Sequence, residues 1–177
     1  MTVKQIFLLP MVAIMLLAIP PAYAAKEGTV QAIIPWEGEG RVFSVGPKTV
    51  MFLGSLTGVM YVENVDGDMH EAFVVCPIVQ EINMETGASE GSGRCEITSS
   101  ADTVAYAKIS CKGRPGECAG VFTLTSGEGE WAGITGSGKL SVRSPIRTLI
   151  ADMPTGAVLR VASGLAVIDN LKYSIPE

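Results

Sequence analysis

The sequence predicts an all-β protein: a single closed antiparallel β-barrel, with a β-sandwich as the alternative, after an N-terminal signal peptide. Two observations predict the strands. Beyond residue 24, apolar and polar residues alternate with turn residues about every ten positions, and no window longer than about ten residues has helical spacing. The 20 glycines of the 177-residue chain predict closure, because glycine-bent strands let a sheet curve until it has no edges.

Residues 1–24 have the pattern of a signal peptide. Lys4 supplies a small positive region, residues 6–19 form an uncharged apolar run, and Ala22-Tyr23-Ala24 places small residues at the cleavage positions. We expect cleavage before Ala25 and a periplasmic or secreted protein. An uncleaved membrane anchor is the alternative, since a spanning helix needs about 20 apolar residues.

The mature chain, residues 25–177, is short enough for one β-barrel domain. Only Lys4 of the 13 basic residues and none of the 18 acidic residues precede it, which leaves 12 against 18 and a net charge of −6. This acidity argues against a nucleic-acid partner, which requires clustered Lys and Arg. We also expect no transmembrane segment in the mature chain, because no second apolar run is long enough.

The strands are expected in order along the chain. The first two are predicted at residues 28–34 and 41–45, with a turn at residues 35–40. Gly54 and Gly58 interrupt the next run, residues 50–63, and indicate bends in one curved strand. After a turn at residues 64–68, the remaining strands are expected at residues 71–82, 93–98, 104–111, 119–124, 139–144 and 157–161, and residues 165–173 are expected to add a last edge strand.

Four cysteines in an exported chain favour two disulfides. Cys76 and Cys95 are centred on a turn near Glu85, and Cys111 and Cys118 on a turn within residues 113–116. Residues opposite each other in a hairpin lie within disulfide reach.

A Cys95–Cys111 bridge is also centred on a turn, but it would leave Cys76 and Cys118 roughly 14 Å apart at about 4.8 Å per strand. We therefore favour Cys76–Cys95 and Cys111–Cys118 and keep Cys95–Cys111 as the alternative. Cys95 and Cys111 share a strand face with apolar residues, which predicts that the bridges are buried structural links.

Two motifs suggest chemistry, and each has a simpler interpretation. Residues 133–139 read G-x-x-x-x-G-K, but Leu140 follows where a phosphate-binding loop has Ser or Thr, and a strand rather than a helix is expected next. Asp66, Asp68, His70 and Glu71 cluster as metal ligands could, yet they fit a polar hairpin turn. We therefore expect no catalytic, cofactor-binding or metal-binding residue.

Residues 122–136 hold a strand, a glycine turn and one tryptophan. We interpret Gly127, Gly129, Trp131, Gly133 and Gly136 as a fold-signature loop, with Trp131 closing one end of the barrel. The segment resembles the signature of allene oxide cyclase-like and dirigent-like barrels. It is also similar to exported bacterial proteins that share Val75-Cys76-Pro77 and Gly93-Arg94-Cys95.

The resemblance implies an eight-stranded antiparallel barrel with a central cavity, and we keep nine strands as the alternative count. Plant members cyclise an epoxide fatty acid or steer radical coupling, mostly by the shape of a pocket. None of their catalytic residues matches a position here. Barrels of this kind often form dimers or trimers, so a homo-oligomer is an expectation that the resemblance alone supplies.

Three functions are consistent with these features. The first is binding of an apolar small molecule in the barrel, without a cofactor; the second is a cofactor-free cyclase or isomerase; the third is a structural module with a filled barrel. Inward residues would discriminate between them. Small ones, such as Ala105, Ala107, Gly54 and Gly58, would leave a cavity, whereas an acid or a tyrosine inside it would favour an enzyme. Tyr61, Tyr106 and Trp131 are aromatic candidates for the lining.

Overall fold

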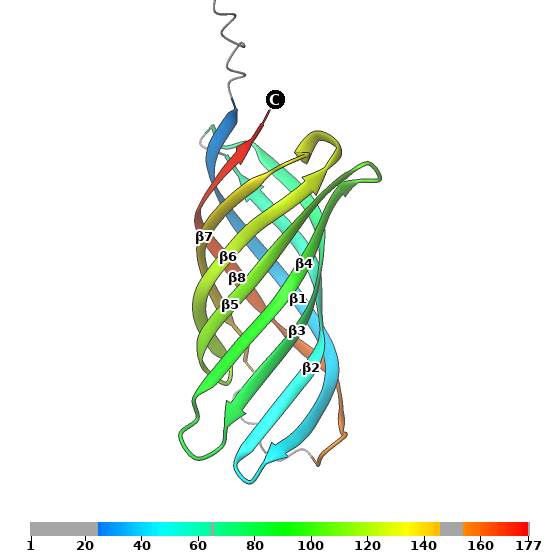
Figure 1. Ribbon diagram of the computed structural model, residues 1–177, viewed down its shortest axis with the longest axis vertical. Coiled ribbons are helices and arrows are strands. Elements are labelled where there is room, and N and C mark those ends of the chain that lie inside the picture. Colours follow the sequence, from blue (N-terminus) through cyan, green and yellow to red (C-terminus); the bar gives the residue numbers. More distant parts are fainter. Residues whose placement is uncertain (1–24, 65, 146–153, 177) are drawn as a thin grey trace, which may run out of the picture.

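The protein is a closed antiparallel barrel of eight strands in sequence order, in which β8 pairs with β1 (Figure 1). The computed structural model describes residues 25–64, 66–145 and 154–176. The expected leader, residues 1–24, lies outside them. The strands are β1 (Lys26–Gly46), β2 (Thr49–Glu63), β3 (Met69–Asn83), β4 (Ser89–Ser100), β5 (Thr103–Arg114), β6 (Glu117–Glu128), β7 (Thr135–Arg143) and β8 (Val158–Ile175), and a 3-10 helix, η1 (Gly129–Trp131), lies between β6 and β7.

The two ends of the barrel are built differently. The described chain begins and ends at the upper end in Figure 1, where the β4–β5 turn and the loop between β6 and β7 also lie. The turns of the β1–β2, β3–β4 and β5–β6 hairpins lie at the lower end. Within the described ranges, every strand is paired on both sides, so no sheet edge is left.

The eight-stranded count is confirmed, but two of the expected boundaries are wrong. The turn expected at residues 35–40 lies within β1, which pairs with β2 from Gln31 to Gly46. Residues 165–173 are not an edge strand, because they continue β8 and pair with both β1 and β7. At residues 35–40, proline and glycine mark strand curvature rather than a turn. The alternation of buried Ala32, Ile34 and Trp36 continues into this segment.

Large inward side chains face glycines on the neighbouring strand. Tyr173 lies opposite Gly28, and Trp36 lies opposite Gly164. A Cβ atom at Gly164 would lie 2.5 Å from the indole, and one at Gly28 would lie 2.6 Å from the phenol oxygen of Tyr173. The bore of an eight-stranded barrel is just wide enough for side chains. These two large rings therefore need a small residue across from them, whereas aliphatic residues such as Leu140 and Ile168 face each other directly.

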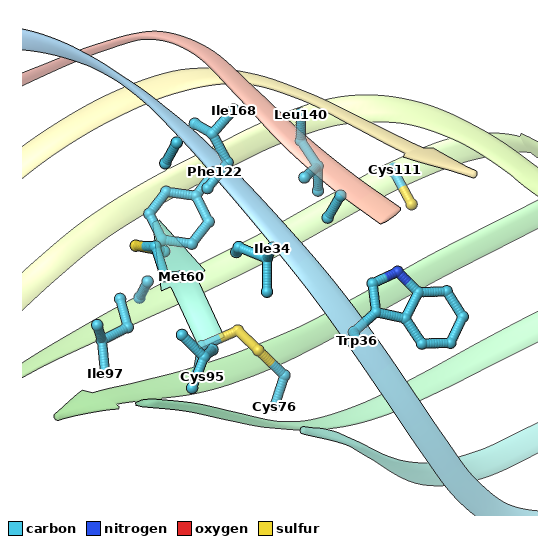
Figure 2. Close-up of a cluster of buried hydrophobic side chains, with 14 of the residues drawn as sticks. Ile34, Trp36, Met60, Cys76, Cys95, Ile97, Cys111, Phe122, Leu140 and Ile168 are labelled. Carbon is cyan, nitrogen blue, oxygen red and sulfur yellow. A yellow bond between two sulfur atoms is a disulfide. The ribbon is translucent and has the colours of Figure 1, made fainter. Parts of the chain in front are cut away.

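The interior is otherwise filled by apolar side chains from all eight strands (Figure 2). One buried member from each strand, in order, is Ala32, Met60, Val74, Ile97, Ala105, Phe122, Leu140 and Ile168. Each of them is no more than 6% exposed. Burial of this apolar surface is the main favourable term in folding, at about 25 cal/mol per Å².

Both favoured disulfides are present. Cys76–Cys95 joins β3 to β4 with the Cα atoms 4.1 Å apart, and Cys111–Cys118 joins β5 to β6 with the Cα atoms 5.5 Å apart. The flanking pairs place Cys76 directly opposite Cys95, as expected for two residues that are equally distant from the β3–β4 turn. Cys76, Cys95 and Cys111 are at most 7% exposed. The bridges therefore connect neighbouring strands from inside the barrel.

The register expected for the second bridge is wrong by two residues. Cys111 lies opposite Gly120 and Cys118 opposite Gly113, so the bridge runs diagonally. The reason is the turn, which uses Pro115 and Gly116 with Arg114 paired to Glu117. A Cβ atom at Gly120 would lie 2.6 Å from the Cα atom of Cys111. The glycines opposite the cysteines leave space for the diagonal bridge.

We predict that Gly40→Ala lowers the free energy of unfolding by about 1–3 kcal/mol, the usual cost of overpacking. A Cβ atom there would lie 2.4 Å from the carbonyl oxygen of Leu53 and 2.6 Å from the Phe52 ring. Gly46→Ala is the matched control on the same strand, because its nearest contacts are Thr49 side-chain atoms at 3.5 Å. Urea denaturation measures both. Equal midpoints for the two variants would contradict the close-packing argument.

We predict that reduction adds about four hydrogens to the intact mass, two for each disulfide. Peptide mapping of the unreduced protein would yield fragments linked through Cys76–Cys95 and through Cys111–Cys118. The bridges are cross-strand neighbours, so no rearranged species is expected. A fragment that links Cys95 to Cys111 would overturn the pairing.

Candidate ligand-binding cavities

The interior of the barrel holds a cavity at each end. The larger, which we call the upper cavity, has a volume of about 320 Å³ and lies at the end where the described chain begins and ends. The lower cavity has a volume of about 110 Å³ and lies at the end with the β5–β6 turn. The two share no lining residue. Two places for a ligand therefore have to be considered separately.

Phe122 of β6 lies between the two ends. It is 1% exposed and lines both the upper cavity and a small central void of about 40 Å³. Figure 2 shows its ring beside Met60, with Ile97 on the side of the upper cavity and Trp36 at the opposite end of the cluster. The central void shares Trp36 with the lower cavity. The packed layer around Phe122 is thus the partition between them.

The upper cavity has an apolar interior and a charged rim. Its apolar lining comes from seven of the strands and from the loop after β6, and includes Val30, Met60, Ala72, Ile97, Ala105, Phe122, Leu124, Trp131, Ile134 and Leu171. Lys26, His70, Glu71 and Glu130 also line it and are exposed. Such a lining suits a ligand with an apolar body and a polar outer end.

The signature loop forms part of this rim. Gly129 and Gly133 adopt φ angles of +64° and +73°, which glycine reaches without strain. A Cβ atom at Gly129 would lie 1.8 Å from the carbonyl oxygen of Asp102, so the loop packs closely onto the β4–β5 turn. This tight loop places Trp131, half-buried, against the cavity and Ile134 beneath it.

The lower cavity is narrower and almost wholly apolar. Phe52, Leu56, Ile78, Ile109, Val142 and Leu159 form its walls together with the Cys111–Cys118 disulfide, and Pro115, Gly116 and Glu117 lie at its mouth. Gln80 contributes the polar part of the wall. Its Nε2 donates to the hydroxyl of buried Ser89 at 2.7 Å, which fixes the amide.

Trp36 carries the one buried side-chain polar atom of the described residues that has no hydrogen-bond partner, its Nε1–H. The indole is 9% exposed and lines both the lower cavity and the central void. Indole nitrogen is a donor only, and leaving a buried donor unpaired costs about 1–3 kcal/mol. Buried groups of this kind are rare, and each calls for a physical reason.

The acidic cluster near the β2–β3 turn has a structural role. The Asn64 side-chain oxygen accepts from the backbone N–H groups of Asp66 and Asp68, at 2.9 Å each, and orders the turn. His70 and Glu71 lie farther along, on β3, at the rim of the upper cavity. Across the described ranges, no group of three or more His, Cys, Asp and Glu side chains is arranged to hold a metal ion.

The small residues proposed to leave a cavity behave differently from one another. Ala105 lines the upper cavity and Gly58 the central void. The space inside Gly54 is taken by the Phe52 ring, because a Cβ atom there would lie 2.4 Å from it. Ala107 is 2% exposed and part of the core. Only part of the glycine and alanine content therefore creates space.

Two of the three aromatic candidates do not line a cavity. Tyr61 is 39% exposed on the outer face of β2. The Tyr106 hydroxyl lies on the outer face of β5, where it donates to Glu128 Oε1 at 3.3 Å. Trp131 does line the upper cavity, together with Tyr173, which the sequence analysis did not single out.

Comparison of the chain with protein-family models, with curated proteins and with solved structures finds no match. In the part of the chain that the structure describes, there is no helix of the length and apolarity that crossing a membrane requires. Because no relative indicates a function, the function has to be inferred from the two cavities.

The residue that the sequence analysis missed most clearly is Trp36. Trp36 falls within residues 35–40, where Pro35, Gly38 and Gly40 predict a turn. The alternation of Ala32, Ile34 and Trp36 with exposed Ile33 and Pro35 is the signal that could have found it.

We predict that Glu128→Gln lowers the pKa of Tyr106 toward 10.0. The Glu128 carboxylate is the main cause that raises this pKa, through its charge, followed by partial desolvation, the hydrogen bond to Glu128 and the charge of Glu96. Removal of the carboxylate stabilises the phenolate, so more of it forms at a given alkaline pH. Tyrosinate absorbance, taken as the difference from Tyr106→Phe, measures the change. Glu130→Gln is the control, and an unshifted titration in Glu128→Gln would contradict the assignment.

Proposed function

We propose that the protein is a small exported barrel that binds an apolar small molecule in the upper cavity. The observation that carries the proposal is the cavity of about 320 Å³ with an apolar interior, open at a charged rim. Pockets for small molecules range from about 300 to 1,000 Å³ and bury most of the ligand. The volume therefore suits a compact ligand rather than a long lipid.

The lining defines the chemistry of this ligand. Deep inside, Met60, Phe122 and Leu124 offer only apolar surface, each Å² of which contributes about 25 cal/mol on burial. The rim carries both signs of charge, with Lys26 and His70 beside Glu71 and Glu130. An ionic end group would meet a like charge as well as an opposite one. A neutral polar end group, such as a hydroxyl or a carbonyl, fits best.

Two features support export. One is the leader pattern of residues 1–24. The other is the pair of disulfides, which persist in oxidising compartments and are rare in the cytosol. An exported binding protein would meet its ligand in the periplasm or outside the cell.

A cofactor-free cyclase or isomerase is the second candidate. Tyr173 favours it, because a phenol that lines an apolar cavity can hold or move a proton at a bound substrate. The resemblance of residues 122–136 to allene oxide cyclase-like barrels points to the same class. Such an enzyme would act mainly by holding a reactive chain in a folded conformation. An extracted molecule that the protein converts to a new product, but not after Tyr173→Phe, would favour it.

A barrel without a ligand is the third candidate, and the packed layer at Phe122 supports it. Because that layer divides the bore, there is no continuous lumen. Native mass spectrometry of protein isolated from the periplasm, followed by extraction, separates this candidate from the others. A bound apolar molecule supports a binding function, and a protein that carries none and takes up no apolar probe would refute it.

We predict that N-phenyl-1-naphthylamine, a neutral apolar fluorophore, binds in the upper cavity and receives excitation energy from Trp131. The chain has two tryptophans, and only Trp131 lines the upper cavity, so Trp131→Phe should lower the transfer efficiency more than Trp36→Phe does. Ala105→Leu fills the cavity and should weaken binding about tenfold or more, which corresponds to about 1.4 kcal/mol.

The matched control is Ala162→Leu, which adds the same side chain at the lower cavity. It should leave the affinity for the fluorophore unchanged. Ala72→Leu is a second filling variant at the upper cavity, in case Ala105→Leu does not fold. If both filling variants bound the fluorophore as tightly as the original chain, the upper cavity would not be its site.

A further inference from the structure

We propose that the lower cavity is a second ligand site, separate from the upper cavity, in which the Nε1–H of Trp36 donates a hydrogen bond to a neutral single-ring molecule with one acceptor atom. A cyclic or aromatic ketone is the simplest molecule of this class. The proposal does not depend on the function proposed for the upper cavity.

The size of the cavity limits the ligand to about one ring. Its volume is about 110 Å³, and the adjoining central void adds about 40 Å³ beyond Trp36, Leu56, Ile109 and Val142, which line both. Apolar cavities of roughly 150 Å³ are known to admit benzene. A fatty acyl chain would not fit within such a space.

The unpaired indole N–H supplies the specificity. Among the described residues, no acceptor reaches it, and it has less than 1 Å² of exposed area. Because the N–H is covered in this structure, the proposed binding requires the side chains around it to shift so that the ligand's acceptor can reach it. A site with a buried donor discriminates against analogues that lack the acceptor, because the donor then stays unpaired.

The donor is held in a fixed position. A Cβ atom at Gly164 would lie 2.5 Å from Cζ2 of the indole, and one at Gly38 would lie 3.5 Å from Cζ3. Glycines on β1 and β8 thus accept the ring and leave it little freedom to turn away. A donor fixed in advance loses little conformational entropy when the ligand binds.

The walls exclude charged ligands. Phe52, Ile78 and Leu159 offer no counter-charge, and burial of an unpaired ion is very unfavourable. At the mouth, Glu117 is already paired with Arg143. Gln80 is engaged with Ser89. Among the buried side-chain polar atoms of the described residues, the indole N–H of Trp36 is the one without a partner. A ligand that complements it needs one neutral acceptor.

Nuclear magnetic resonance of the whole protein tests the proposal, because the two indole N–H signals report the two cavities. Trp36 lines the lower cavity and Trp131 the upper one. Cyclohexanone should shift the Trp36 indole proton downfield and leave that of Trp131 in place. Methylcyclohexane has the same number of heavy atoms and no acceptor. The ratio of the cyclohexanone affinity to the methylcyclohexane affinity should be about tenfold higher in the original chain than in Trp36→Phe, as expected for one hydrogen bond.

Two variants separate this site from the upper one. Trp36→Phe keeps a ring but removes the donor, so it should weaken cyclohexanone binding more than methylcyclohexane binding. Ala162→Leu should block cyclohexanone and leave N-phenyl-1-naphthylamine binding intact, whereas Ala105→Leu should do the reverse. The titration of the original chain stands even if Trp36→Phe does not fold.

Three results would overturn the proposal. One is a ketone-to-hydrocarbon affinity ratio that is the same in the original chain and in Trp36→Phe, and another is a response at Trp131 alone. The third is a Trp36 indole proton that already has the downfield shift and a water contact before ligand is added, because the N–H would then be satisfied by bound water. Failure of the fluorophore to bind in the upper cavity would leave this test unchanged.

Discussion

The structure depends on one steric constraint, the narrow bore of an eight-stranded barrel. Glycine stands across from several of the largest inward rings, such as Tyr173 opposite Gly28 and Trp36 opposite Gly164, whereas smaller aliphatic side chains still face each other. Gly40 and Gly54 even face each other, and the Phe52 ring covers both. The glycines allow the strands to approach and curve, while the aromatic rings fill the space above them. The same glycines therefore serve both the closure of the barrel and the packing of its core.

The same constraint determines where space remains. Around Phe122 the inward residues are large enough to meet, and the interior is closed to a few tens of Å³. Toward the upper end Ala72 lies opposite Met60 and Ala105 opposite Ile97, and all four line the cavity of about 320 Å³. Toward the lower end, glycines make room for Trp36 itself, which occupies much of the width and leaves a smaller cavity beside it. The cavities thus lie where small inward residues, such as Ala105 and Ala162, line the bore.

The sequence was sufficient for features that depend on local periodicity. The antiparallel barrel, the curved strand through Gly54 and Gly58, and both disulfides could be predicted from alternation, turn residues and hairpin symmetry, whereas the count of eight strands came from the family resemblance. Residues 35–40 could not, because Pro and Gly indicate a turn unless the neighbouring strands are known to curve there. The position of the second bridge within its hairpin required the register, which two turn residues determine. The cavities required the pairing of all eight strands, because opposing residues such as Trp36 and Gly164 lie far apart in the chain.

Phe122 decides whether the two cavities act independently. Its ring lines the upper cavity on one side and the central void on the other, and it is 1% exposed. Ile34 and Leu140 adjoin the same void, so a rotation of the ring would have to displace side chains that are themselves packed. Close-packed interiors do not deform continuously. A ligand bound in the upper cavity as proposed would leave the Trp36 side unchanged as long as it did not move Phe122, so the two proposed sites would be independent of each other.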